Sequence, residues 1–154
     1  MSHTVRLEQH PGIPLAVVKL RASQQDLPKV VPAACGKVWN VMRSQQVAGA
    51  GRHVALYWDG VINLEVGVEL PAPFGGHGDV VDSSTPAGPV ATTTHFGPYN
   101  QLAGAHDAIR QWCAANGRTF AGPSWEIYGH WTDECNNHPS KIRTDIYYLL
   151  TVDK

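Results

Sequence analysis

The sequence predicts an α+β fold made of two βαββ units, about residues 5–72 and 84–152, related by a pseudo-twofold axis. Three observations lead to this prediction. The same order of patterns (strand, long helix, strand, strand) occurs twice along the chain. A segment rich in proline and glycine, residues 71–78, separates the two occurrences. The length of 154 residues fits one domain that buries about two thirds of its unfolded surface.

The first unit opens with an apolar strand at residues 13–20. A capping signal at residues 23–26 then precedes a long helix. Pro28 and Pro32 suit a broken first turn of this helix better than its interior. Beyond them, apolar side chains recur at helical spacing and define the buried face, at Val31, Cys35, Val38 and Met42, with Trp39 beside them.

We expect this helix to end at Gly49 and Gly51, because glycine readily adopts the conformation that terminates helices. Two strands follow, at residues 54–58 and 62–70. The Asp59-Gly60 pair between them is a strong hairpin signal. The two strands should therefore be antiparallel neighbours.

The second unit repeats this order. Its first strand is expected at residues 89–95, and Gly97-Pro98 opens a helix that Asn116-Gly117 ends. The closing strands are expected at residues 125–131 and 143–152. The apolar stripe of this helix is formed by Leu102, Ala105, Ile109 and Trp112.

Composition and charge exclude several classes of function. The net charge is −1 and no basic run is present, so we expect no direct binding to nucleic acid or to a membrane surface. No apolar run approaches the ~20 residues of a membrane helix. The N-terminus lacks the apolar core of a secretory signal, so a cytoplasmic location is expected. Three widely spaced cysteines, Cys35, Cys113 and Cys135, argue against a disulfide framework.

The strand at residues 125–131 places a carboxylate between large apolar side chains. Alternation sends Trp125 and Ile127 to one face of the sheet, and Glu126 and Tyr128 to the other. An ionised carboxylate avoids apolar surroundings unless another group compensates it. Glu126 is therefore expected either at an exposed edge or in a pocket that receives a positive or proton-exchanging guest.

The strand at residues 62–70 alternates in the same way. Its apolar residues share one face, whereas Asn63, Glu65, Gly67 and Glu69 share the other. That second face is either simply solvated or lines a ligand site. For Glu65 we favour the site, because the absent side chain of Gly67 leaves room for a guest beside it.

Several segments together resemble the GyrI-like effector-binding domains. Residues 88–91 (GPVA) and 95–99 (HFGPY) resemble the start of their second half, and residues 64–68 (LEVGV) the end of their first half. Residues 125–128 (WEIY) and 144–146 (TDI) resemble their last two strands. The resemblance extends over nearly the whole chain. It departs from the family in the loop 129–140, which holds His130, Trp131, Cys135 and His138.

The resemblance implies a stand-alone domain with a central groove that accepts bulky, flat, often cationic molecules. Glu126 would be the pocket carboxylate, with Tyr128 beside it. Some relatives are hydrolases that open the cyclopropane ring of DNA-alkylating natural products, and one founding member inhibits DNA gyrase. A drug-binding module, a hydrolase and a protein-interaction module of unknown partner are therefore the three functions to separate.

Binding requires one acid and several aromatic rings, because a delocalised cation is attracted by a ring face by about 0.5–2 kcal/mol per contact. The tryptophans on helix stripes are also good core residues, so their place in the site stays open. The candidate ligand-binding residues are Glu126, Tyr128, Tyr57, Trp39, Trp112, Glu65, Tyr147 and His95.

Hydrolysis would require more. Glu126 would act as general acid or base, while Tyr128 or a second acid such as Glu65 handles the other proton. Binding is favoured, because nothing in the sequence requires catalysis. We expect neither a cofactor nor a metal: His130, Cys135 and His138 have a suitable spacing for a metal but no evident fourth ligand.

Overall fold

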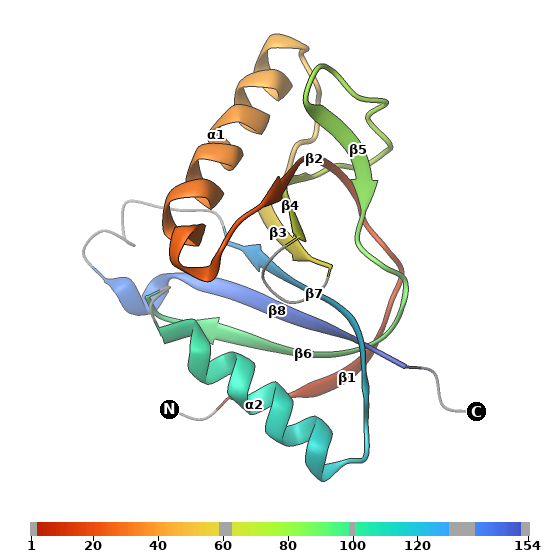
Figure 1. The fold of residues 1–154 in the computed structure, drawn as a ribbon, viewed down its shortest axis with the longest axis vertical. Helices are drawn as coiled ribbons and strands as arrows, with labels where there is room; N and C mark the ends of the chain where they lie inside the picture. Colours follow the sequence, from red (N-terminus) through yellow and green to blue (C-terminus); the bar gives the residue numbers. More distant parts are fainter. Residues whose placement is uncertain (1–2, 59–62, 99–100, 130–137, 152–154) are drawn as a thin grey trace.

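The described part of the protein is an α+β fold with antiparallel strands and two long helices, as the sequence predicts, and its strands join in one sheet. The computed structural model describes residues 3–58, 63–98, 101–129 and 138–151. Within them, eight strands form a single sheet on which two α-helices pack (Figure 1). The strands are β1 (Arg6–His10), β2 (Pro14–Arg21), β3 (His53–Tyr57), β4 (Asn63–Glu69), β5 (Val80–Ser84), β6 (Gly88–Phe96), β7 (Phe120–Tyr128) and β8 (Arg143–Leu150), and the helices are α1 (Leu27–Ser44) and α2 (Leu102–Ala115).

The strand order reveals the two βαββ units. The order across the sheet is β1-β6-β8-β7-β3-β4-β2-β5, so the first unit supplies β3-β4-β2 and the second supplies β6-β8-β7. The units meet where β3 pairs with β7, in a register that places Ala55 opposite Glu126 and His53 opposite Tyr128. The centre of the sheet is thus the junction of the two units.

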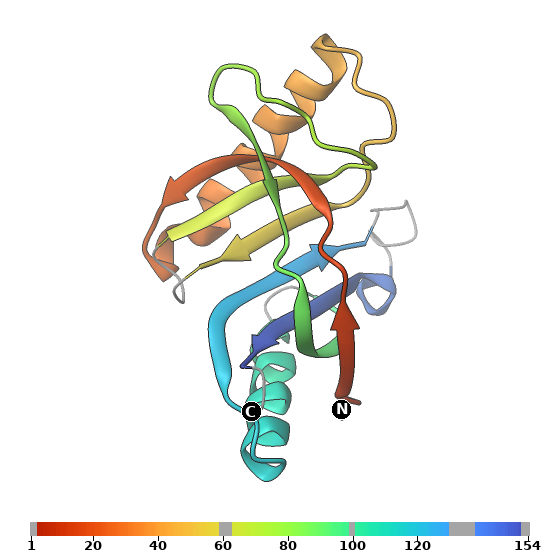
Figure 2. The ribbon, with the colours of Figure 1, turned by 90° about the vertical axis from the view of Figure 1, so that its right-hand side faces the viewer.

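The two edge strands are exchanged between the units. β1 precedes the first unit but pairs with β6, whereas β5 precedes the second unit but pairs with β2. The sheet is strongly curved (Figure 2). The segment that follows β1 contacts the segment that follows β5. The Ile13 amide donates to Thr85 Oγ1 at 2.7 Å, the Thr85 amide donates to the Ile13 carbonyl at 3.0 Å, and His10 Nε2 lies 2.8 Å from Thr85 Oγ1.

The curvature lets one face of the sheet pack largely against itself. Trp125, Leu56 and Leu15 from three different strands are fully buried together on this face. Such burial stabilises a fold by about 1.5–3 kcal/mol for each large apolar side chain. We call this side of the sheet the inner face, and the side that carries the helices the helix face.

Each helix covers the outer strands of its own unit. Val38 and Met42 of α1 are buried against β2 and β4, and Ile109 and Cys113 of α2 are buried with Ile146 of β8. Figure 1 shows the two helices at opposite ends of the sheet, with β3 and β7 between them. The helix face of these central strands is therefore where a site common to both units can form.

Two local expectations differ from the structure. α1 ends at Ser44, before Gly49, because Gln46 adopts φ 55° and the Val47 amide donates to the Met42 carbonyl at 2.9 Å. Pro32 lies inside the helix, where its missing N–H costs an intrahelical bond. The sequence patterns also do not predict β1, which is mostly polar and exposed, or β5, in which two valines are followed by three polar residues.

The space expected beside Gly67 does not exist. A Cβ atom on Gly67 would lie 1.7 Å from the Ala16 carbonyl oxygen and 2.8 Å from Val17 Cα. Glycine is needed here because the backbone of β2 approaches that of β4, and not because a guest occupies the position.

Candidate functional site

Glu126 lies near the middle of the helix face. It is opposite Ala55 in β3 and Ile146 in β8, so strands cover it on both sides. Only 7% of its surface is exposed. The predicted alternation along β7 is confirmed, since Trp125 and Ile127 pack on the inner face while Glu126 faces α2. Glu126 is therefore not at an exposed edge, and the alternative of a pocket that receives a guest stays a prediction.

Both carboxylate oxygens of Glu126 are engaged. The Tyr128 hydroxyl donates to Oε1 at 2.6 Å, and His106 Nε2 on α2 lies 2.7 Å from Oε2. The other ring nitrogen of His106, Nδ1, lies 2.6 Å from the Tyr148 hydroxyl. Arg110 donates to that same hydroxyl at 3.3 Å. A continuous hydrogen-bonded chain thus runs from Tyr128 through Glu126 and His106 to Tyr148.

Tyr57 on β3 adds a third phenol to this site. Burial, followed by the negative charge of Glu126, raises its pKa above the ordinary value. The same two causes raise the pKa of Tyr128, and burial raises that of Tyr148. All three phenols therefore remain protonated at neutral pH and can donate hydrogen bonds. We call Glu126, His106, Tyr57, Tyr128 and Tyr148 the glutamate cluster.

Two further polar side chains share the helix face with the glutamate cluster. Thr144 lies opposite Tyr128, and His95 lies opposite Thr144 on the next strand. Thr144 is fully buried, and its hydroxyl has no hydrogen-bond partner among the described residues. His95 is 2% exposed and bonds His3 at 3.0 Å rather than Glu126. His95 thus lies on the same face of the sheet as Glu126 but is not part of the glutamate cluster.

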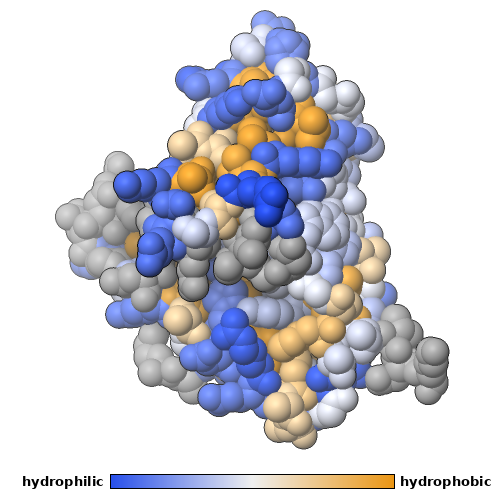
Figure 3. Space-filling model, viewed as in Figure 1, coloured by the Kyte–Doolittle hydropathy of each residue, from blue (hydrophilic) through white to orange (hydrophobic). Residues whose placement is uncertain are grey.

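Trp39 lies at the α1 side of this face. Its ring packs edge-on against His53, with ring centroids 6.1 Å apart, and His53 is opposite Tyr128. The Trp39 side chain is 40% exposed. Figure 3 shows that apolar side chains also reach the surface over α1 and over the C-terminal half of α2. The helix face therefore offers apolar area at its margin as well as a buried acid.

The structure separates three other predicted residues from Glu126. Glu65 lies on the inner face, where it accepts hydrogen bonds from Trp58 Nε1 at 2.7 Å and from the Ser83 hydroxyl. Tyr147 also lies on the inner face, stacked on Trp125 with centroids 5.4 Å apart. Glu65 therefore cannot serve as the second acid beside Glu126, because the sheet stands between them.

Trp112 lies on the side of α2 that faces residues 3–5. It lines a hollow of about 510 Å³ together with His3, Val5 and Gln111. His106 is six positions earlier on the helix, which places it about 120° around the axis from Trp112. Trp112 and the glutamate cluster therefore lie on different sides of α2.

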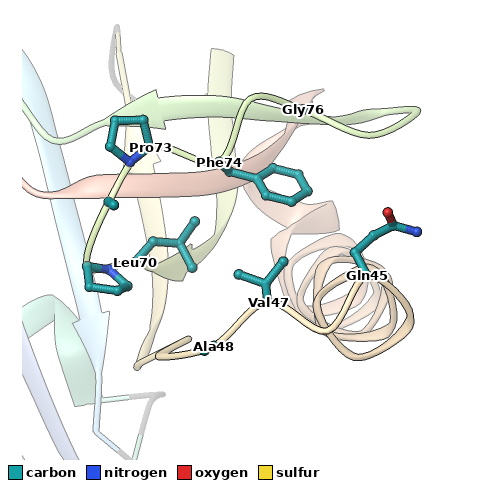
Figure 4. A pocket seen from close by; sticks show the side chains of 9 residues that line it. Gln45, Val47, Ala48, Leu70, Pro73, Phe74 and Gly76 are labelled. Atoms are coloured by element: carbon teal, nitrogen blue, oxygen red, sulfur yellow. The ribbon is translucent and has the colours of Figure 1, made fainter.

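A second hollow, of about 400 Å³, lies between the end of α1 and the chain that follows β4. Figure 4 shows Val47, Leu70 and Phe74 around it. Neither hollow is lined by Glu126. The central groove expected from the sequence therefore remains a prediction.

The sequence analysis did not include His106 and Tyr148 in the site. His106 lies four positions after Leu102 and three before Ile109, at the edge of the apolar stripe, and a polar residue there signals a buried contact. Tyr148 and Tyr147 are adjacent, so alternation separates them, and only the pairing of Tyr148 with Ser124 shows which one shares the face of Glu126.

The suggested metal loop and the hairpin turn lie largely outside the described residues. Among the described residues, no group of three or more His, Cys, Asp or Glu side chains could hold a metal ion. His130 and Cys135 of the suggested metal loop lie outside those residues, as does the Asp59-Gly60 turn. Cys113 is buried and Cys35 partly buried, as expected for small apolar side chains. None of the described helices is long and apolar enough to cross a membrane.

Comparison with known families identifies the fold. The model of the GyrI-like small molecule binding domain matches residues 3–150. The chain belongs to this family. The family resemblance of its short motifs is thus confirmed, and so is the small-molecule-binding class of the domain. A search of curated protein sequences gave no significant match.

Solved structures share this fold at low sequence identity. The EcmrR C-terminal domain is 20% identical, with a TM-score of 0.75, and the match covers 99% of this chain and 100% of that one. SAV2435 bound to tetraphenylphosphonium is 12% identical, with a TM-score of 0.69 and coverages of 98% and 94%. A hydrolase from Listeria innocua is 12% identical, with a TM-score of 0.63 and coverages of 96% and 92%. At these identities the likeness establishes the fold alone.

Proposed function

We propose that this domain binds bulky hydrophobic cations, with Glu126 as the counter-ion. The observation that carries the proposal is a carboxylate only 7% exposed, at the junction of the two units and surrounded by three tyrosines. A buried carboxylate is costly unless it is paired or hydrogen-bonded. A delocalised organic cation satisfies the charge, and its apolar surface gains from contact with aromatic rings.

The geometry of the glutamate cluster suits this role. Tyr57 and Tyr128 contact the carboxylate from two neighbouring strands, and Tyr148 on a third strand bonds His106, which lies against the other carboxylate oxygen. Hydrogen bonds to a charged acceptor are worth about 1.5–3 kcal/mol, so the carboxylate is stabilised before a ligand arrives. In the ligand class we include tetraphenylphosphonium, because SAV2435 has the same fold and its structure contains that cation.

Calorimetric titration with tetraphenylphosphonium tests the proposal. We expect saturable binding to the wild type and a loss of about 10- to 100-fold in affinity for Glu126→Gln, which removes the charge but keeps the shape. Glu65→Gln is the matched control, because Glu65 is equally buried, at 6%, but lies on the inner face. Equal affinities of wild type and Glu126→Gln would overturn the proposal, as would an equal loss in both variants.

Hydrolysis of a strained ring is a second candidate, favoured by the chain Tyr128–Glu126–His106. Glu126 takes a proton from water, the water oxygen bonds to a ring carbon, and the ring C–C bond breaks. The released carbon takes a proton from Tyr128, which Glu126 then reprotonates across their 2.6 Å hydrogen bond. The net change is the addition of one water to the substrate.

Mass spectrometry of a cyclopropane-bearing alkylator incubated with the protein tests this candidate. Gain of one water by the substrate, absent with Glu126→Gln, would establish an enzyme. An unchanged substrate, together with Glu126-dependent binding of tetraphenylphosphonium, would leave binding as the function.

A further inference from the structure

His106 is itself a possible counter-ion of Glu126. Its Nε2 lies 2.7 Å from Glu126 Oε2, so a protonated His106 already neutralises the carboxylate. We infer that binding of an organic cation at Glu126 is coupled to the loss of a proton from His106. This inference rests on the proposed function and adds a regulatory property: the site opens to cations as the pH rises.

The hydrogen bonds of His106 allow both protonation states without movement of a heavy atom. In the neutral state Nε2–H donates to Glu126, and the Tyr148 hydroxyl donates to Nδ1 across 2.6 Å. In the charged state both ring nitrogens donate, and the Tyr148 oxygen accepts from Nδ1–H. Only the hydroxyl hydrogen of Tyr148 has to turn. The cluster is therefore arranged to exchange a proton at His106 Nδ1.

The two states present different charges to a ligand. With His106 protonated, the Glu126–His106 pair is neutral overall, and an entering cation meets a like charge within a few ångströms of its counter-ion. With His106 neutral, the pair carries one negative charge. The neutral state of His106 therefore attracts an organic cation more strongly than the charged state does.

The groups around His106 are few. β7 presents Glu126 and Tyr128, β8 presents Tyr148, and β3 presents Tyr57. On its own helix, Arg110 donates to Tyr148 and pairs with Asp107 at 3.0 Å. His95 and His3 bond each other, and His3 lines a hollow together with Asp107 of α2. The three phenols stay protonated at neutral pH, so Glu126 and His106 are the two members of the glutamate cluster that carry charge. His53 of β3, opposite Tyr128, is a further titratable side chain on this face.

Tetraphenylphosphonium is a suitable probe, because its charge does not depend on pH. We expect its affinity for the wild type to rise with pH between 5.5 and 8.5, by up to about tenfold per pH unit where His106 carries the proton. Titrations below the midpoint of this rise, in two buffers of different ionisation enthalpy, should show release of up to about one proton per bound cation.

Two variants test whether the released proton comes from His106. His106→Gln can still donate to Glu126 but cannot titrate, so its affinity should be the same at pH 5.5 and 8.5, within about twofold. His10→Gln is the control: His10 is also buried, at 7%, but it lies against Trp125 on the inner face. This variant should keep the pH dependence of the wild type.

A spectroscopic measurement locates the proton. The ring nitrogen shifts of His106 followed by NMR should show a neutral ring whenever tetraphenylphosphonium is bound, because the inferred coupling removes the proton from His106. If affinity depends on Glu126 but neither varies with pH nor releases protons, the coupling is overturned while the proposed function stands. If Glu126→Gln binds the cation as tightly as the wild type, the proposed function itself fails.

Discussion

Gly67→Ala should destabilise the fold severely, because the added methyl group would clash with the backbone of β2. Its Cβ would lie 1.7 Å from the Ala16 carbonyl oxygen and 2.7 Å from the carbonyl carbon. Both atoms belong to the backbone of β2, which pairs with β4 over seven residues. A normal contact requires β2 to move by about 1.5 Å or more, which breaks the ladder around Val17 and Gly67.

The expected cost exceeds that of ordinary overpacking. Extra methyl groups in cores cost about 1–3 kcal/mol when side chains can adjust. Because a backbone must move here, we expect a loss of about 3–5 kcal/mol in the free energy of unfolding, which is large compared with the 5–15 kcal/mol of a typical domain.

Gly36→Ala is the matched control for this change. Gly36 lies inside α1, and a Cβ there would meet no atom within 4 Å. Alanine should stabilise the helix by about 0.5–1 kcal/mol. Urea unfolding followed by tryptophan fluorescence measures both variants. If Gly67→Ala unfolds within about 0.5 kcal/mol of the wild type, the close approach of β2 and β4 is wrong.

Two further predictions concern the tyrosine pair and His10. Tyr148→Phe should lower the free energy of unfolding by about 1–2 kcal/mol, because the Tyr148 hydroxyl bonds His106 and Arg110. Tyr147→Phe should change the free energy of unfolding by less than about 0.5 kcal/mol. Equal losses for the two variants in urea titrations would contradict this prediction. Burial lowers the pKa of His10 below 6.5, although Glu8 raises it, so the unfolded chain binds the proton more readily and stability should fall as the pH drops below 6.5. Urea midpoints between pH 8 and 5 should fall less for His10→Gln, and parallel curves would contradict the assignment.

The sequence was a good guide wherever the evidence is local. Alternation along one strand correctly separated Glu126 from Trp125, because it depends only on the pleat of that strand. The helical spacing of Val38 and Met42 likewise identified the buried face of α1. These patterns need no knowledge of neighbouring elements.

The sequence failed where the answer depends on pairing between distant strands. Tyr147 and Tyr148 are equivalent within β8, and the register with β7 decides which one faces His106. Glu65 and Glu126 are separated by the sheet for the same reason. The edge strands β1 and β5 were not predicted because neither shows an alternation of apolar side chains: β1 is mostly polar and exposed, and the two valines of β5 are adjacent.

The exchange of β1 and β5 makes each half of the chain incomplete by itself. A lone copy of β1 and its βαββ unit would leave the outer edge of β2 without the partner that β5 supplies. Such an open edge exposes unpaired N–H and C=O groups, which recruit strands from other chains. A single unit could close its sheet only in a dimer whose members trade their first strands. In the present chain the two units exchange their edge strands within one polypeptide, so each half needs the other to complete its sheet.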